Sequence, residues 1–411
     1  MTSASMPAPI AVPYSRASWA YAFFLAFIVI VYSASAHLVP QLEVIAPGKT
    51  VIALAFFALL WACTMGRRNF TLGLGAGGGA LYLFSLAVIV SPLWSRWPSV
   101  SFEAAAESIK YLAGFVVAAN VLDSRRRVRH ALAVLALAAL FPAIGAISNY
   151  VGGVDLVEGT RARWLGVFRN PNYLAYYLVM SVPLALALRD ATTAVRHRAL
   201  VRLGWLAIAA VLVVAILLTG SRGGTLGLGA VLLLWLVRSL ARGRIAVGAA
   251  AALIVGLMMT PSSPLAREDT QATLSGKIDA SAQGRIDAWR TAERIVYDKP
   301  LLGVGAGAFI PSYEIYAPGD AGPARAAHNS FAMIAAELGL PVLAVFCSAL
   351  VFAMLSLGRV ARRSPPRQAA IARGLQCALF GFVVCSLTGG YAYTWPLYFV
   401  LGIAAALERN T

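Results

Sequence analysis

The sequence predicts an all-α polytopic membrane protein with about twelve transmembrane helices. Of its 411 residues, 60% are hydrophobic and only 12% are charged, whereas about 25% are charged in a typical soluble protein. Apolar runs of about 20 residues recur along the whole chain, and a helix of that length crosses a ~30 Å hydrocarbon core. The sequence therefore belongs with proteins that span a membrane many times.

The expected spans divide the chain into three regions. They lie at residues 19–38, 50–64, 71–92, 106–122, 130–150, 171–188, 200–219, 223–238, 245–260, 328–357, 369–388 and 392–408. Residues 1–260 hold the first nine of these spans with short loops, and residues 328–411 hold the last three. Residues 261–327 form a large external loop between spans nine and ten.

Basic residues mark one side of the membrane. Most of the 34 lysines and arginines lie at the termini or in and beside connections at 65–70, 123–129, 189–199, 239–244 and 358–368. Short loops rich in Lys and Arg stay in the cytoplasm, so both termini are expected there. The segment 261–327 carries arginines too, but long loops cross regardless of charge. It is expected in the periplasm, outside a bacterial inner membrane.

Charge and cysteine content exclude other classes of protein. The net charge of +17 would suggest a nucleic-acid partner in a soluble chain. Here the basic residues lie between apolar runs, which indicates contacts with lipid headgroups, and no nucleic-acid partner is expected. The four cysteines fall inside expected spans, where a thiol behaves as a small hydrophobe: Cys63, Cys347, Cys377 and Cys385.

The loop that ends in Arg161 and Arg163 leads into a helix start. Asn170 before Pro171 is a good N-cap with proline at the first helical position. The free N–H groups and the dipole of a helix N-terminus favour an anion. The arginines therefore bind either lipid headgroups or a phosphate-bearing ligand, and Asn172 lies beside them.

The stretch Thr219–Thr225 joins two apolar runs with almost no loop. Its glycines predict a tight helical hairpin, and Ser221 is expected to cap the second helix. Arg222 needs a different explanation, because a guanidinium close to hydrocarbon usually faces a polar cavity and a partner. We expect Arg222 to line such a cavity.

Within the expected external loop, residues 261–327, the residue pattern changes at Gly284. Apolar residues then recur at helical spacing up to Val296, and Arg285 and Arg290 take other faces. This predicts an amphipathic helix on the outer membrane surface, with arginines that bind either headgroups or a ligand. The glycines at 303–307 do not form a nucleotide-binding motif, because no strand precedes them; they indicate a loop whose backbone packs close to the membrane surface.

His328 is the candidate general base. It stands at the external mouth of an expected span, beside Asn329 and shortly after Arg325. With an ordinary pKa near ~6.5, a histidine accepts a proton at neutral pH. No spacing typical of metal ligands occurs outside the spans, so no metal or cofactor is expected. Several cations and one base suit the displacement of a diphosphate by a sugar hydroxyl.

A series of short motifs resembles the O-antigen ligase and polymerase superfamily, over about residues 90–345. They are Ser221-Arg222-Gly223-Gly224, Gly284-Arg285 with Trp289, Pro300-Leu301-Leu302-Gly303-Val304-Gly305 with Phe309, His328-Asn329, and Glu337-Leu338-Gly339-Leu340-Pro341. The resemblance implies a membrane glycosyltransferase that takes a glycan from an undecaprenyl-diphosphate donor. Most like the ligases, it would transfer this glycan to a sugar of the lipid A–core.

The resemblance also implies roles for individual residues. His328 would activate the acceptor hydroxyl, and Arg222 and Arg285 would hold the diphosphate and stabilise its charge as it leaves. The family pattern implies direct displacement with inversion and without metal. Arg161 and Arg163 are added to the diphosphate site on the physics of helix ends. Candidate supporting residues are Asn329, Asn172, Arg290 and Arg325.

Other functions stay open at this point. A polymerase would use the same machinery with the growing glycan as acceptor, and a protein O-oligosaccharyltransferase would use a protein hydroxyl. A twelve-span secondary transporter is a further alternative, since residues 65–68 resemble a transporter loop motif. The aspartate of that motif is missing, and acidic residues inside the spans are nearly absent, which disfavours ion-coupled transport.

Overall fold

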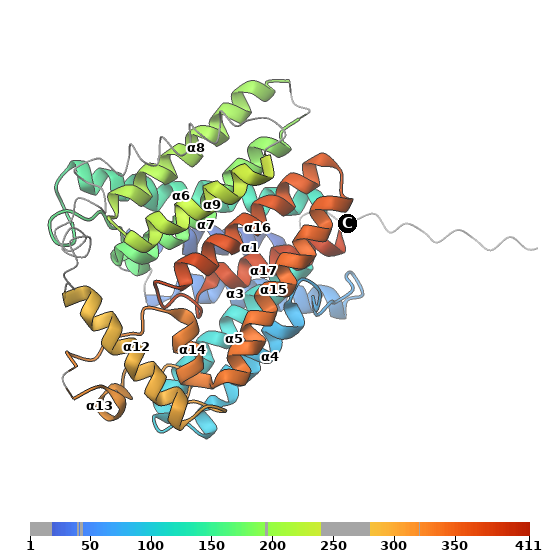
Figure 1. Ribbon diagram of the computed structural model, residues 1–411. Helices are drawn as coiled ribbons and strands as arrows, with labels where there is room; N and C mark the ends of the chain where they lie inside the picture. The colour runs from blue at the N-terminus through green and yellow to red at the C-terminus, as the bar shows by residue number, and fades with distance from the viewer. Residues whose placement is uncertain (1–18, 39–40, 42–43, 194–195, 240–279, 320) are drawn as a thin grey trace, which may run out of the picture.

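A computed structural model describes residues 19–38, 41, 44–193, 196–239, 280–319 and 321–411. These residues form helices joined by loops, and none of them lies in a strand (Figure 1). An isolated bridge between Val157 and Arg161 is the sole strand-like pairing in these ranges. The all-helical class that composition and periodicity predicted is confirmed.

The helices follow the expected order along the chain. The longer ones are α1 (Trp19–Ser33), α3 (Pro47–Thr64), α4 (Gly78–Val90), α5 (Pro98–Val121), α6 (Arg125–Val151), α7 (Pro171–Ala191), α8 (Arg198–Leu218), α9 (Arg222–Ser239), α12 (Ala280–Asp298), α15 (Leu340–Arg363), α16 (Pro366–Ser386) and α17 (Trp395–Arg409). Shorter elements are η1 (Ser35–Leu38), η2 (Ser91–Leu93), η3 (Gly166–Arg169), α13 (Tyr313–Tyr316) and α14 (Ser330–Leu338).

Six helices among the described residues are long and apolar enough to cross a membrane: α3, α6, α7, α8, α15 and α16. Trp19–Ser33 and Gly78–Leu93 are shorter apolar helices. The span expected at 245–260 and the polar stretch 261–279 lie outside the described residues. A membrane protein is supported, and the count of twelve spans stays a prediction.

Two expected spans differ from the helices observed. The span expected over 71–92 becomes helical only at Gly78, because residues 71–74 are irregular and a turn follows at 75–77. The single span expected over 328–357 is two helices, α14 and α15, which meet at Gly339. Gly339 has φ +85°, and a Cβ there would lie 2.2 Å from the Leu301 carbonyl oxygen, so only glycine fits.

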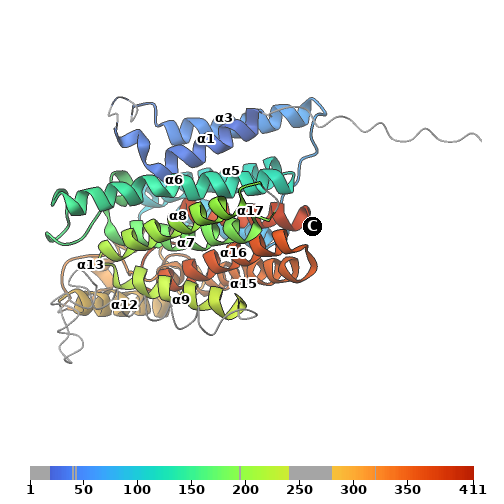
Figure 2. The same ribbon diagram turned by 90° about the horizontal axis from the view of Figure 1, so that it is seen from above.

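The bundle has a buried centre and an apolar outside. α7 and α16 pack against each other, and α7 also packs against α6, α8 and α9. Most of α7 and α16 is buried, whereas little of α3 and α8 is. In Figure 2, α1 and α3 form a separate outer layer on one side of the bundle. Exposed apolar helices around a packed centre are what a lipid-facing surface requires.

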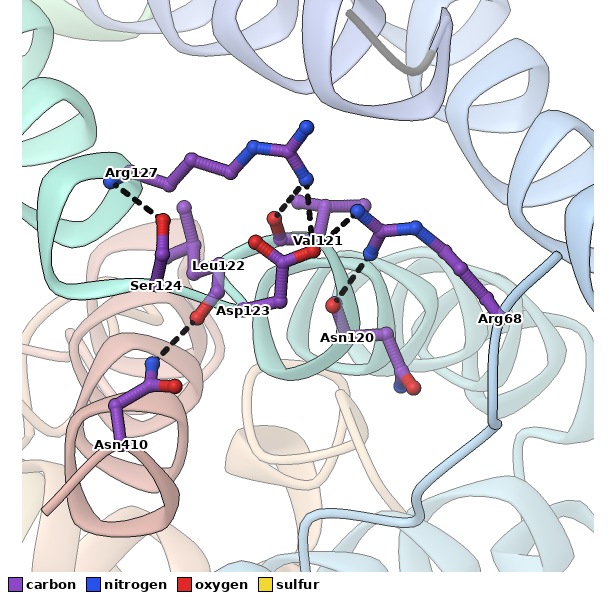
Figure 3. A network of polar contacts seen from close by, with 8 residues as sticks. All are labelled: Arg68, Asn120, Val121, Leu122, Asp123, Ser124, Arg127 and Asn410. Atoms are coloured by element: carbon purple, nitrogen blue, oxygen red, sulfur yellow. Dashed lines mark hydrogen bonds and ion pairs between the residues drawn. The ribbon is translucent and has the colours of Figure 1, made fainter. Parts of the chain in front are cut away.

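A polar network closes one end of the bundle, which we call the C-terminal end (Figure 3). Arg68 and Arg127 both pair with Asp123, with 3.0 Å from Arg127 Nη1 to Asp123 Oδ2. Arg68 Nη1 also donates to the Asn120 carbonyl at 2.9 Å. Asn410 Nδ2 donates to the carbonyl just before Asp123 at 2.8 Å. The arginine-rich connections 65–70 and 123–129 therefore meet the chain terminus here.

The opposite end, which we call the α12 end, carries α12, α13 and α14 (Figure 1). α12 runs across the ends of the bundle helices, as the amphipathic pattern predicted for a helix there. Its apolar face does not depend on lipid, however, because Ala292 and Ile295 are buried in a small core with Phe309, Tyr313 and Ala336. The expected surface helix is thus a packed part of the protein.

A glycine loop, residues 300–307, joins this small core to the bundle. The N–H of Val304 donates to the Ala336 carbonyl at 3.0 Å, and the N–H of Gly305 to the Glu337 carbonyl at 2.8 Å. On its other side, Ser95 Oγ donates to the Val304 carbonyl at 3.1 Å. The glycine loop therefore packs against α14 and Ser95, and its expected position close to the membrane surface stays a prediction.

The substitution Gly305→Ala tests this packing. Gly305 has φ +104°, and a Cβ there would lie 2.3 Å from Ser95 Oγ. We expect the free energy of unfolding to fall by at least about 2 kcal/mol, from backbone strain and the clash. Unfolding in detergent measures it. Gly229→Ala, whose Cβ would meet nothing within 4 Å, is the control. An equal, small effect of both substitutions would contradict the packing role.

Candidate active site

The turn between α8 and α9 is the tight hairpin that its glycines predicted. α8 ends at Leu218 and α9 begins at Arg222. Ser221 caps α9, because its Oγ accepts a hydrogen bond of 3.1 Å from the Gly224 N–H. Gly220 has φ +59°, which glycine adopts without steric cost. Arg222 is therefore fixed, half-buried, in the first turn of α9.

Two glycines let α9 approach α7 and the connection between α16 and α17. A Cβ on Gly223 would lie 2.1 Å from Thr388 Oγ1 and 2.8 Å from the Tyr176 hydroxyl oxygen. A Cβ on Gly224 would lie 2.5 Å from a side chain of α7. No larger residue fits these gaps. The glycines therefore allow the α9 backbone next to Arg222 to pack directly against the Tyr176 hydroxyl.

Arg161 braces this turn from inside the protein. Its buried side chain donates from Nε to the Thr219 carbonyl at 3.0 Å and from Nη2 to Asn172 Oδ1 at 2.9 Å. Asn172 lies in the first turn of α7, which Asn170 caps as predicted. Arg161 and Asn172 thus tie the start of α7 to the turn that carries Arg222.

Arg163 faces a different partner. Its Nε donates to Asp155 Oδ1 at 3.0 Å, and the two side chains form an ion pair. The Arg163 side chain is 30% exposed. Arg161 and Arg163, expected to act together on one ligand, are therefore directed to separate neighbours.

Two contacts fix the segment before α14 against α12. Trp289 Nε1 donates to the Ala327 carbonyl at 2.9 Å. Gly284 leaves room for the Arg325 guanidinium, since a Cβ there would lie 1.7 Å from Arg325 Nη1. The residue that follows Ala327 is His328, so both contacts set its position relative to α12.

His328 lies beside two cations. Burial and the positive charges of Arg285 and Arg325 hold the pKa of His328 below its ordinary value of 6.5. The imidazole is therefore neutral at pH 7 and able to accept a proton. Its φ of +48° is uncommon for a residue other than glycine, and such conformations persist where the surroundings hold them.

Arg285 links His328 to the turn between α8 and α9. Its guanidinium acts electrostatically on the Tyr176 hydroxyl, which also contacts Ser221. Arg285 is thus close to both His328 and the Tyr176 hydroxyl, and Arg222 directly follows Ser221, which contacts the same hydroxyl. Nothing in the sequence pointed to Tyr176, because a tyrosine inside an apolar run has no distinguishing spacing.

Asn329 and Ser330 hold the start of α14. Asn329 Oδ1 accepts hydrogen bonds of 2.9 and 3.1 Å from the N–H groups two and three residues further on, so Asn329 caps the helix. Ser330 Oγ donates to the Gly389 carbonyl and accepts from the Tyr391 N–H, both at 2.8 Å. The position of His328 therefore depends on α12, α14 and the connection between α16 and α17.

Glu337 holds the glycine loop at the other end of α14. Its side chain is buried, and Oε1 accepts a hydrogen bond of 3.3 Å from the Phe309 N–H. Burial raises the pKa of Glu337 to about 7. Glu337 opens the motif Glu337-Leu338-Gly339-Leu340-Pro341, and the resemblance implied no role for its side chain. An acidic residue inside an apolar run was the signal that could have identified it.

Two cavities lie on the α5 side of this site. The larger, of about 520 Å³, has aromatic walls that include Tyr32, Tyr173, Tyr177, Tyr391 and Trp395. The smaller, of about 280 Å³, lies between α5, the chain just after the glycine loop and α14. Glu107 and Tyr111 line both cavities, so the two share a wall.

The remaining predicted residue, Arg290, lies on the exposed side of α12. Within the ranges that the structure describes, no group of three or more His, Cys, Asp or Glu side chains is arranged to hold a metal ion.

The arginines at 161 and 163 provide a matched test of the site's framework. We expect Arg161→Ala to lower the free energy of unfolding by about 2 kcal/mol or more, because it leaves buried polar partners unsatisfied. Arg163→Ala removes a partly exposed ion pair and is expected to cost less than about 1 kcal/mol. Both are measured by unfolding in detergent. If Arg163→Ala lowered the free energy of unfolding as much as Arg161→Ala, Arg161 would not have the proposed role of holding the turn between α8 and α9.

A comparison with known proteins adds to this geometry. Residues 206–347 match a family model described as O-Antigen ligase. The match includes Arg222, Arg285, Arg290, Arg325, His328 and Asn329, and Arg161, Arg163 and Asn172 lie outside it. No curated protein matches the chain closely enough to identify a relative. The chain thus carries a segment, residues 206–347, that is similar to the O-antigen ligase family.

Proposed function

We propose that this protein is an O-antigen ligase that transfers a glycan from undecaprenyl diphosphate to a sugar hydroxyl of the lipid A–core. One observation carries the proposal: His328, with its lowered pKa, lies beside Arg285 and Arg325 within the matched domain. Family members are glycosyltransferase-type enzymes. The α12 end is then the periplasmic face of the inner membrane, and the arginine-rich C-terminal end is cytoplasmic.

The roles follow from the contacts. Arg222, in the first turn of α9, and Arg285 bind the diphosphate, whose negative charge also suits a helix N-terminus. Their guanidinium groups stabilise the charge that grows on the diphosphate as it leaves. Arg161 and Asn172 act by holding the turn, and Asn329 acts by holding α14. Arg163 and Arg290 have no part in the reaction in this account.

The reaction is a single displacement with inversion. The acceptor oxygen forms a bond to the anomeric carbon while the bond from that carbon to the diphosphate oxygen breaks. The electron pair of the broken bond stays on the diphosphate. The proton of the acceptor hydroxyl passes to His328, which is neutral and therefore able to take it.

An in vitro transfer assay tests the function. Purified protein receives undecaprenyl-diphosphate glycan in EDTA, with or without lipid A–core. Glycan on lipid A–core is the expected product and would make the transfer independent of metal. Longer lipid-linked chains without acceptor would identify a polymerase instead. If neither forms, transfer to a protein hydroxyl and substrate transport in proteoliposomes are the alternatives to measure.

Arginine-to-lysine substitutions test the diphosphate site. Arg222→Lys and Arg285→Lys keep the charge but lose the planar fork that binds phosphate in two places, so each is expected to raise the KM for the donor at least about tenfold. Arg294→Lys is the control on the same helix as Arg285, because Arg294 bonds to the carbonyl of Ala317. Unchanged donor kinetics in both test variants would remove the diphosphate role.

The pH dependence tests His328. Its positive neighbours lower its pKa, so Arg325→Gln should raise that pKa and move the acidic limb of kcat/KM to higher pH. Arg325→Lys keeps the charge and should leave the limb in place. His328→Ala should lower kcat/KM at least about 100-fold, and His130→Ala, at the other end of the bundle, should not. An acidic limb that stays fixed in Arg325→Gln would contradict the assignment.

A further inference from the structure

The connection between α16 and α17, residues 387–394, bonds to two separate helices of the candidate site. Thr388 in this connection bonds to the Tyr176 hydroxyl of α7. The next residue, Gly389, accepts a hydrogen bond of 2.8 Å from Ser330 Oγ in the first turn of α14. Because Thr388 and Gly389 are adjacent, α7 and α14 are held at neighbouring points of one short segment.

The Tyr176 hydroxyl forms the contact toward the arginines. It donates to the Thr388 carbonyl at 3.1 Å, and its oxygen lies 3.2 Å from Thr388 Oγ1. Because its hydrogen is directed to that carbonyl, its lone pairs are left for other groups. Ser221, which caps α9, contacts this hydroxyl, and the positive charge of Arg285 acts on it. The hydroxyl oxygen therefore attracts both the turn before Arg222 and the guanidinium of α12.

Close packing leaves this contact no room to shift. A Cβ on Gly389 would lie 2.3 Å from the Tyr176 ring, and one on Gly223 would lie 2.1 Å from Thr388 Oγ1. The Tyr176 ring also packs edge-on against Tyr391, with the ring centroids 5.7 Å apart. The first turn of α9, which contains Gly223, is therefore fixed against the connection.

Ser330 forms the contact toward the base. Its buried hydroxyl donates to the Gly389 carbonyl and accepts from the Tyr391 N–H, both at 2.8 Å. These two bonds fix the first residue of α14 to the connection. His328 lies two residues earlier, with Asn329 between them. The connection therefore also sets where the imidazole lies.

We propose that Tyr176 and Ser330 are positioning residues of the transfer reaction, through which residues 387–394 hold the diphosphate arginines and the base at a fixed separation. Tyr176 acts on Arg222 and Arg285, and Ser330 acts on His328. The proposal rests on the proposed transferase function. A direct displacement needs the leaving group and the base to be held on opposite sides of one carbon atom, and a small misplacement of either is costly.

Removing one hydroxyl tests the contact toward the arginines. Tyr176→Phe keeps the ring and loses the bond to Thr388, so Arg222 and Arg285 are held less firmly. We expect the KM for the lipid-linked donor to rise at least about threefold, because the arginines bind its diphosphate. Thr388→Val removes the other hydroxyl of the contact and should raise the same KM. A loss of folded protein alone would lower the measured kcat and leave this KM in place.

The pH dependence tests the contact toward the base. Burial and the charges of Arg285 and Arg325 lower the pKa of His328. Ser330→Ala loses the two bonds of the hydroxyl, so the imidazole moves away from these surroundings and its pKa rises toward the ordinary value. The acidic limb of kcat/KM should then move to higher pH, because a general base must be neutral to accept a proton. The KM for the donor should not change.

Two matched controls carry the same substitutions. Tyr177→Phe removes a hydroxyl from the next residue of α7, which is equally buried but contacts Ser181 of its own helix. Ser312→Ala removes a buried hydroxyl that donates to the Ala308 carbonyl, within its own turn. Both controls should keep the donor KM and the acidic limb of the wild type.

Three results would overturn the proposal. The first is a donor KM that stays fixed in both Tyr176→Phe and Thr388→Val. The second is an acidic limb that stays fixed in Ser330→Ala. The third is a change in the control variants as large as that in the test variants.

A binding measurement keeps the outcome separate from that of the proposed function. Inorganic pyrophosphate, as a probe of the arginines, is titrated into wild type, Tyr176→Phe, Tyr177→Phe and Ser330→Ala in detergent, and the heat of binding is measured. Binding to Tyr176→Phe that is at least about threefold weaker than to the other three proteins would uphold the role of Tyr176 even if no glycan were transferred. Equal binding to Tyr176→Phe and Tyr177→Phe, or no binding to wild type, would overturn it.

Discussion

The backbone contact between the glycine loop and the end of α14 is the constraint on which the site depends. Val304 and Gly305 donate to carbonyls of α14 at 3.0 and 2.8 Å, and the Glu337 side chain accepts a hydrogen bond from Phe309, just after the loop. α14 cannot shift along its axis without breaking these bonds. Because His328 precedes α14, the loop also sets the distance between the imidazole and the arginines on α12.

The sequence predicted local structure well where one residue type had one physical role. Ser221 and Asn170 cap helices as expected, because a side-chain oxygen before an apolar run satisfies free N–H groups. The break at Gly339 was missed. Apolar residues continue across it, and Pro341 fits the first turn of a helix, so only the tertiary contact with Leu301 reveals why the chain must turn there.

In the candidate site, too, the sequence predicted some features, and others became clear only from the fold. That Arg222, Arg285 and His328 form one site was predicted from short motifs and their order, and it stays a prediction. The contacts of Arg161 and Arg163 were not predicted, because the two residues are two positions apart and have the same chemistry. Their partners, Thr219 and Asp155, come from distant or irregular parts of the chain. The role of Glu337 likewise needed the fold, since its bonding partner is 28 residues away.

The central claim is that Arg222 and Arg285 hold the donor diphosphate within reach of His328. A structure determined with undecaprenyl-diphosphate glycan bound measures this most directly. The account predicts that the diphosphate contacts both guanidinium groups, with the anomeric carbon on the His328 side. A diphosphate bound away from both arginines, or on the far side of α14 from His328, would contradict it.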